Sequence, residues 1–168
     1  MNLQYTPKTY RKLGFEKLEV AEIVSRLNIT LCSYQVFYHK LQNFHWNVVG
    51  SDFFDIHDLT EELYTTSVAD IDRVAERIRV FGETPKYRLS SYIRDSIITE
   101  TSHDKSAEFM MKELVDDIQK LIETILDVHE YASRNGDVSS TRMAEDLIAK
   151  LEISHWKLTA WSNRQYKK

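Results

Sequence analysis

Within residues 43–78, five side chains have both a type and a spacing suited to forming one kind of metal site. They comprise two histidines and three acids: His45, His57, Glu61, Asp72 and Glu76. On a helical wheel of about 100° per residue that starts at His57, the three acids fall at about 40°, 60° and 100°, so all four share one stripe of a helix. Imidazole and carboxylate ligands suit Fe(II), Mn(II) or Zn(II) more than calcium. The stripe therefore predicts a transition-metal site.

The length of this helix divides the ligands into two groups. At a rise of about 1.5 Å per residue, the His57/Glu61 pair and the Asp72/Glu76 pair are centred about 22 Å apart, so one chain cannot bring them around one ion. If two copies of the helix pack antiparallel about a two-fold axis, each pair meets the other copy's complementary pair, and symmetry makes this happen twice. We predict two equivalent metal sites per dimer, with His45 added from the end of the preceding helix.

Four long helices must position these side chains. Apolar residues recur at three- and four-residue steps, the period of an amphipathic helix, and predict helices at about residues 16–48, 51–81, 102–135 and 137–161. A short helix is expected at LSSYIRDSI. The predicted fold class is all-α, an antiparallel four-helix bundle with a short extra helix in the long connection between helices 2 and 3.

Residues with short polar side chains mark the predicted starts of the helices. Such side chains accept hydrogen bonds from the first free amides of a helix. The expected caps are Ser51 or Asp52 for the second long helix, Ser102 for the third, and Asp137, Ser139 or Ser140 for the last.

The composition suits one cytoplasmic domain. The chain has 168 residues, of which 42% are hydrophobic, enough for a sizeable core. A formal charge of -4 and a pI of about 5.9 exclude a global field that would attract nucleic acid or an acidic membrane. Cys32 is the single cysteine, so no internal disulfide can form. No apolar run suits a signal peptide or a membrane span.

The sequence resembles the Dps family, the miniferritins named as DNA-binding proteins from starved cells. FHWNVVG, FFDIHDLTEEL and DIDRVAERIRVFGETP carry the resemblance and contain all five ligand-type residues. LSSYIRDS is similar to the family's short central helix, GDVSS to the turn before its last helix, and LEISHWKLTAW to its closing stretch. The likeness spans residues 15–163. It implies a single ferritin-like (Dps) domain over 1–168, with 1–15 as a mobile N-terminal tail.

The resemblance implies an iron-storing ferroxidase. His45, His57 and Glu61 of one subunit would join Asp72 and Glu76 of its two-fold mate. A hollow dodecamer of such dimers would oxidise Fe(II), preferably with hydrogen peroxide, store ferric mineral and protect against oxidative damage. Iron is the expected metal, with zinc or manganese as alternatives in the same site. Candidate mineral-nucleating acids are Glu113, Asp116, Asp117, Glu123 and Asp127.

The resemblance also assigns expected roles outside the ligand set. Trp46 resembles the family's tryptophan near the iron site, where it would either quench stray oxidising equivalents or pack at the dimer interface. Asp137, Glu145 and Asp146 would line a pore through which iron enters. Arg142 departs from the pattern, because the family often has an acid at this place.

Three other interpretations remain open. Two Glu-x-x-His motifs would build an iron site within one bundle, as in bacterioferritins. They are Glu100 with His103, and Glu152 with His155. Alternatively, basic terminal residues would bind DNA phosphates in a nucleoid-associated protein, with iron oxidation as a secondary role. These residues are Lys8, Arg11, Lys12, Lys17, Arg164, Lys167 and Lys168. A plain helical oligomer would use the histidines only for structure.

Overall fold

The structure is a computed structural model that describes residues 13–164. Its helices, in chain order, are α2 (Lys17–Asn47), α3 (Phe53–Val80), α4 (Leu89–Asp95), α5 (Ala107–Arg134) and α6 (Val138–Arg164). No strand occurs among the described residues. The predicted all-α fold is confirmed, including the short helix between the second and third long helices.

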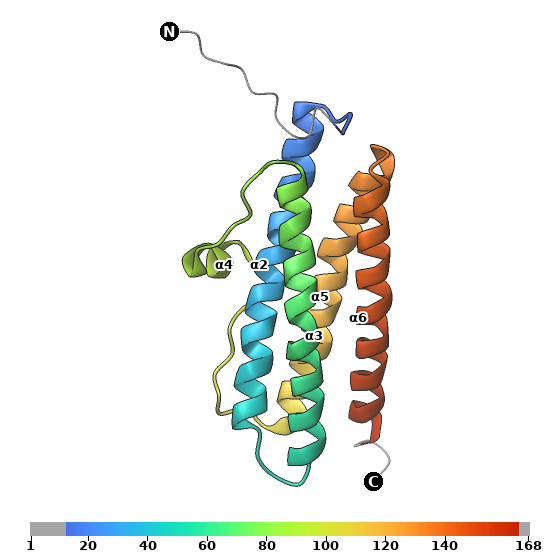
Figure 1. Cartoon of the computed structure of the whole chain (residues 1–168). Coiled ribbons are helices and arrows are strands. Elements are labelled where there is room, and N and C mark those ends of the chain that lie inside the picture. The colour runs from blue at the N-terminus through green and yellow to red at the C-terminus, as the bar shows by residue number, and fades with distance from the viewer. Residues whose placement is uncertain (1–12, 165–168) are drawn as a thin grey trace.

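The four long helices form two antiparallel pairs (Figure 1). α2 packs against α3, α5 packs against α6, and α2 also contacts α5. The short α4 lies outside the bundle, against α2. The connection between α3 and α5 returns the chain along the length of the bundle, so that α5 starts at the end where α3 started.

Buried aliphatic side chains fill the space between the helices. The core stripe of α3 follows the predicted phase, with Ile56, Leu63, Val74 and Ile78 all buried. Each such side chain contributes about 1.5–3 kcal/mol when it leaves water. The stripe of predicted ligands on α3 lies beside this core, with His57 half-buried and Glu61, Asp72 and Glu76 exposed.

The turn between α2 and α3, residues 48–52, brings the end of one helix beside the start of the next. Val48 is buried in it, and Gly50 has a φ of 109°. A positive φ is strained for residues with a Cβ atom and is readily adopted by glycine. The turn thereby sets the last residues of α2 opposite the first turns of α3.

The helix starts agree only in part with the predicted caps. Asp52 precedes α3, but its side chain makes no capping hydrogen bond. Asp137 is the cap of α6, because it accepts a bond of 3.1 Å from the backbone amide three residues further on. The prediction of Ser102 is wrong. Its hydroxyl donates to Asp104, and α5 begins later, at the Ser106 cap.

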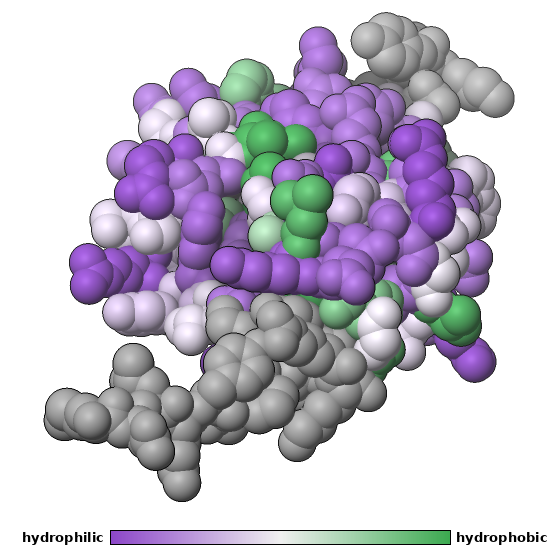
Figure 2. Space-filling model, turned by 90° about the horizontal axis from the view of Figure 1, so that it is seen from above, coloured by the Kyte–Doolittle hydropathy of each residue, from purple (hydrophilic) through white to green (hydrophobic). Residues whose placement is uncertain are grey.

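Figure 2 views the bundle from the end where α3 and α5 finish. Hydrophilic side chains cover most of this end, around a small hydrophobic group. Phe15, at the close of the expected tail, packs against Phe81 with ring centroids 5.5 Å apart. Residues 1–12 of that tail lie outside the described residues.

Within 13–164, none of the helices has both the length and the apolar composition needed to cross a bilayer.

Candidate metal centre

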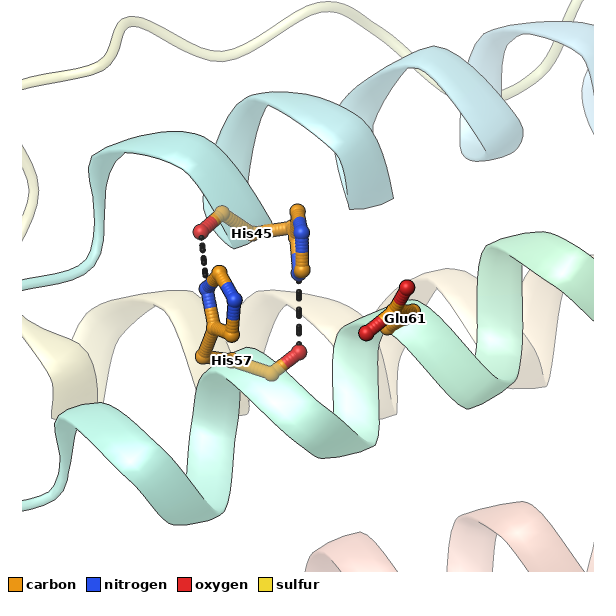
Figure 3. Close-up of side chains that lie close together, drawn as sticks. All are labelled: His45, His57 and Glu61. Carbon is orange, nitrogen blue, oxygen red and sulfur yellow. Dashed lines mark hydrogen bonds between the residues drawn. The ribbon is translucent and has the colours of Figure 1, made fainter.

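His45 near the end of α2 and His57 near the start of α3 face each other (Figure 3). The Nδ1 atom of each ring lies 2.9 Å from the backbone carbonyl oxygen of the other residue. A carbonyl oxygen only accepts hydrogen bonds, so each Nδ1 donates and carries the ring proton. In the neutral rings, both Nε2 atoms therefore keep a lone pair for a metal.

Ring contacts fix the orientation of both imidazoles. The His45 and His57 rings stack with centroids 3.7 Å apart and planes 21° apart. Phe53 also stacks on His57, at 4.9 Å and 23°, and Tyr64 meets the His45 ring edge-on at 5.3 Å. Ligands held by packing and hydrogen bonds in this way are preorganised for binding.

Glu61 extends its carboxylate to the same place from one turn further along α3 (Figure 3). One ligand atom from each of His45, His57 and Glu61 lies within 4.8 Å of the other two. Within residues 13–164, no other group of three His, Cys, Asp or Glu side chains comes this close together. The structure thus unites three of the five predicted ligands. These three residues are called the histidine half-site below.

Tyr64 also contacts the half-site, although it is not among the residues predicted from the sequence to bind metal. Its hydroxyl donates to Oε1 of Glu61 at 3.5 Å. Burial, followed by the negative charge of Glu61, raises the pKa of Tyr64. The sequence does carry a signal, because residues three and seven positions apart lie on one face of a helix, and Tyr64 stands at these spacings from Glu61 and His57.

Asp72 and Glu76 lie far along α3 and take no part in the half-site. Both side chains are exposed, and neither carboxylate has a hydrogen-bond or ion-pair partner among the described residues. The neighbouring Arg73 and Arg77 do have partners, since they form ion pairs of 2.6 Å and 2.5 Å with aspartates on α6 and at its start. α3 therefore presents two carboxylates that its own chain leaves unpaired.

A second polar cluster, Lys40 with Glu113 and Asp117, lies inside the bundle and is called the lysine cluster below. Nζ of Lys40 is 2.8 Å from Glu113 and 2.5 Å from Asp117. The side chains of Lys40 and Asp117 are 1% and 0% exposed. The prediction that Asp117 nucleates mineral on an inner surface is therefore wrong, because the lysine already neutralises this buried carboxylate.

The two Glu-x-x-His motifs do not meet. Glu100 and His103 lie in the connection before α5, whereas Glu152 and His155 belong to α6. They form no metal-type group within the described part of the chain. Between the helices, Asp70 of α3 instead pairs with a lysine of α6 at 2.6 Å. The geometry gives no support to an iron site within one bundle.

Cys32 offers no ligand to any of these places. It is buried and unpaired, and burial raises the pKa of its thiol to about 11. The neutral thiol is a poor metal ligand, because the thiolate is the form that binds.

The three predicted pore acids have different surroundings. Asp137 is buried, caps α6 and pairs with Arg77 at 2.5 Å, so its carboxylate serves the fold. Glu145 and Asp146 are exposed and line a shallow depression together with Arg142. Their pore role stays a prediction.

Trp46 is 68% exposed at the end of α2. It makes no ring contact with the histidines in the described part of the chain, so its two expected roles both stay predictions. The basic residues predicted to bind DNA, apart from Lys17, lie outside the residues whose side chains are described.

Known proteins match the chain over most of its length. The ferritin-like domain family matches residues 24–165. The DNA protection during starvation protein 2 of Bacillus anthracis is 32% identical over 143 residues, which cover 85% of this chain and 98% of that protein. The DNA protection during starvation protein of Brevibacillus brevis is 33% identical over 146 residues, covering 86% and 98% of the two chains.

One solved structure is similar to the chain in both fold and sequence. It is the DPS protein of Vibrio cholerae O1, described as a member of a broad superfamily of ferritin-like diiron-carboxylate proteins. The TM-score is 0.86 at 31% identity, and the match covers 96% of this chain and 99% of that one. Together with the family match and the two relatives, it shows that the chain belongs to the Dps family of ferritin-like proteins.

Proposed function

We propose that the chain is a ferroxidase that oxidises Fe(II) at sites shared between two copies and stores the ferric product. Membership of the family supports iron storage and the protection of DNA in starvation. The observation that carries the proposal is the division of α3. One end holds a half-site with free Nε2 atoms, and the other presents the unpaired carboxylates of Asp72 and Glu76.

Two copies complete the site when their α3 helices pack antiparallel about a two-fold axis. Each half-site then receives Asp72 and Glu76 of the second copy, and the two sites lie about 22 Å apart. The donor set is mixed nitrogen and oxygen without thiolate, which suits Fe(II) and also admits zinc or manganese. The diiron-carboxylate description of the Vibrio cholerae neighbour is consistent with this set.

In the reaction, the protein holds iron as its substrate. Two Fe(II) ions each give one electron to hydrogen peroxide, the O–O bond breaks, and no hydroxyl radical is released. Oxygen is the alternative oxidant. The Fe(III) product hydrolyses and collects as mineral inside a hollow dodecamer in the cytoplasm. Glu145 attracts the incoming cations electrostatically, and Asp146, which pairs with Arg73 at 2.6 Å, contributes less.

The first test is an anaerobic titration with Fe(II), followed by addition of peroxide. We expect rapid growth of ferric absorbance in the native protein. His45→Ala or Asp72→Ala should slow it at least about a hundredfold, the upper range for loss of a group that only supports a ligand. Glu62→Gln is the matched control, because Glu62 is adjacent to a ligand but pairs with Lys157 at 3.2 Å. Unchanged initial rates in both alanine variants would contradict the proposal.

A mixing experiment tests whether each site is shared. In a dimer of one His57→Ala and one Asp72→Ala chain, one of the two sites keeps every ligand. Statistical mixing makes half of the dimers mixed, so about a quarter of native activity should return. Mixing His57→Ala with His45→Ala chains is the control, since both of its half-sites stay damaged. Equal recovery in the two mixtures would show that the sites are not shared.

Direct DNA binding is a separate candidate function, favoured by the names of the relatives. A gel-shift assay over a range of salt concentrations separates it from iron oxidation, because binding to phosphates weakens steeply with salt. Absence of retardation at low salt would remove this role without affecting ferroxidase activity.

The proposed dodecamer has its own test. The mass of the particle is measured together with the number of irons that it stores.

A further inference from the structure

The connection between α4 and α5, residues 96–106, runs along the outside of α2 (Figure 1). Two contacts hold it there. Nδ2 of Asn43 donates to the backbone carbonyl oxygen of Thr101 at 2.8 Å. The hydroxyl of Thr101 also bonds to Glu113, which Lys40 of α2 contacts at 2.8 Å. The connection is therefore anchored beside the last turns of α2.

Three side chains of metal-binding type border one pocket beside this anchor. The pocket has a volume of about 320 Å³, and its lining includes His39 of α2 together with Glu100 and His103 of the connection. His39 lies one helical turn before Asn43, and Glu100 and His103 lie on either side of Thr101 in the chain. The two imidazoles and the carboxylate have no hydrogen-bond or ion-pair partner among the described residues. Their ligand atoms are therefore free to bind an ion.

The chemistry of this pocket suits a transition-metal cation. Two imidazoles and one carboxylate form a donor set that binds Zn(II) and similar ions, and water completes the coordination. Lys40 also lines the pocket, but its ammonium group lies 2.8 Å from Glu113 and 2.5 Å from Asp117. Because these carboxylates neutralise the lysine, it does not exclude a cation from the pocket.

The three side chains are less preorganised than the histidine half-site. Their ligand atoms do not all lie within 4.8 Å of one another, as those of the half-site do. All three side chains are exposed, so rotation about their single bonds can bring the atoms around an ion, at a cost in conformational entropy. Groups that orient a ligand typically contribute about 10–100-fold in metal affinity. We therefore expect binding roughly 10–100-fold weaker than at a completed half-site.

We propose that His39, Glu100 and His103 bind a second transition-metal ion, of the Zn(II) type, on the outside of the bundle. The site is separate from the half-site, because it uses α2 and the α4–α5 connection and no residue of α3. The bound ion links these two segments and so stabilises the connection. The inference does not depend on the proposed function.

The test uses the six histidines of the chain in separate pairs. Its background is the full-length His45→Ala/His57→Ala protein, which lacks both imidazoles of the half-site. Equilibrium dialysis against Zn(II) should find about one bound ion per chain in this background. Further replacement with His39→Gln/His103→Gln should remove that ion. Glu100→Gln should weaken its binding at least about tenfold.

The matched control replaces the other two histidines, His129→Gln/His155→Gln, in the same background. Nε2 of His129 lies 3.4 Å from Glu145, and Nε2 of His155 lies 3.0 Å from Gln119. The control should keep the ion. Both pairs of replacements remove two imidazoles, so a difference between them reports where the ion binds rather than how many histidines remain.

Thermal unfolding and crystallography provide independent measurements. Zn(II) should raise the unfolding temperature of the background protein, because an ion that binds the folded state stabilises it. It should have a smaller effect after His39→Gln/His103→Gln. In a crystal soaked with Zn(II), anomalous scattering at the zinc edge should place an ion in contact with His39, Glu100 and His103.

Equal Zn(II) binding before and after His39→Gln/His103→Gln would overturn the inference. So would loss of the ion in the control alone, or an anomalous peak held by a single histidine. Iron oxidation by an otherwise native His39→Gln/His103→Gln protein should be unchanged. Failure of this site therefore leaves the proposed function standing, and a native protein that binds Zn(II) here without oxidising iron would refute only the proposed function.

Discussion

The lysine cluster and the histidine half-site begin five residues apart on α2, at Lys40 and His45. They differ in how many of their polar atoms have a partner within the chain. In the lysine cluster, the ammonium group meets both carboxylates at 2.8 Å and 2.5 Å inside the bundle. In the half-site, backbone carbonyls bind only the Nδ1 atoms, and both Nε2 atoms keep free lone pairs. The half-site is thus marked by two ligand nitrogens that face no cation or donor. In the lysine cluster, each carboxylate already holds an ammonium group, although Oε2 of Glu113 has no hydrogen-bond partner.

The largest effect on stability should follow from breaking the ion pairs of the lysine cluster. Lys40→Met leaves the buried Asp117 with only the half-exposed Lys120, at 3.2 Å, as a partner. Breaking a buried ion pair costs about 3–5 kcal/mol of unfolding free energy, and the remaining lysine places the expected loss at the lower end of this range. Denaturant unfolding at fixed protein concentration measures the loss. The double variant Lys40→Met/Asp117→Leu removes both charges and should recover most of it. A loss within the ~0.5 kcal/mol of an ordinary surface substitution would contradict the comparison.

A smaller effect should distinguish the two ends of α3. In the metal-free protein, His57→Ala removes one stacked ring and one partly buried hydrogen bond, which together cost about 1–3 kcal/mol. Asp72→Asn removes a carboxylate without a described partner and should stay within ~0.5 kcal/mol. Both variants should nevertheless lose iron oxidation. Thermal unfolding in the presence of a chelator provides the measurement, and a large loss of stability in Asp72→Asn would show that its carboxylate serves the fold.

The sequence predicted the features that depend on helical period. The core residues Ile56, Leu63, Val74 and Ile78 share one face, and the phase of His57 and Glu61 follows from the same period. Four long helices and one short helix occur in the expected order. The separation of the half-site from Asp72 and Glu76 also needed only the rise per residue.

Other features depend on contacts between helices, which no local pattern contains. The reciprocal bonds of His45 and His57 require the exact pairing of α2 with α3. Asp117 resembles a surface acid in sequence, and only the position of Lys40 across the bundle explains its burial. Ser102 was the predicted cap of α5, but its hydroxyl donates to Asp104, and Ser106 caps the helix instead.

The smallest predicted effect is the pH dependence of the stability that the lysine cluster provides. Burial alone would raise the pKa of Glu113, but hydrogen bonds from Lys40 and Thr101 outweigh it, so the pKa lies below its ordinary value. A carboxyl group with a lowered pKa in the folded state stabilises the protein above its unfolded-state pKa of about 4.3, and this contribution disappears as the pH falls through the folded-state pKa.

Glu113→Gln should therefore be less stable than the native protein near pH 6, and the difference should narrow as the pH falls towards about 3. Unfolding midpoints across this range measure it. In a Lys40→Met background, the first of the two hydrogen bonds that lower the pKa is gone, so the same substitution should have a weaker dependence on pH. A difference that stays constant, or that grows in acid, would mean that Lys40 and Glu113 do not form a closed pair in solution.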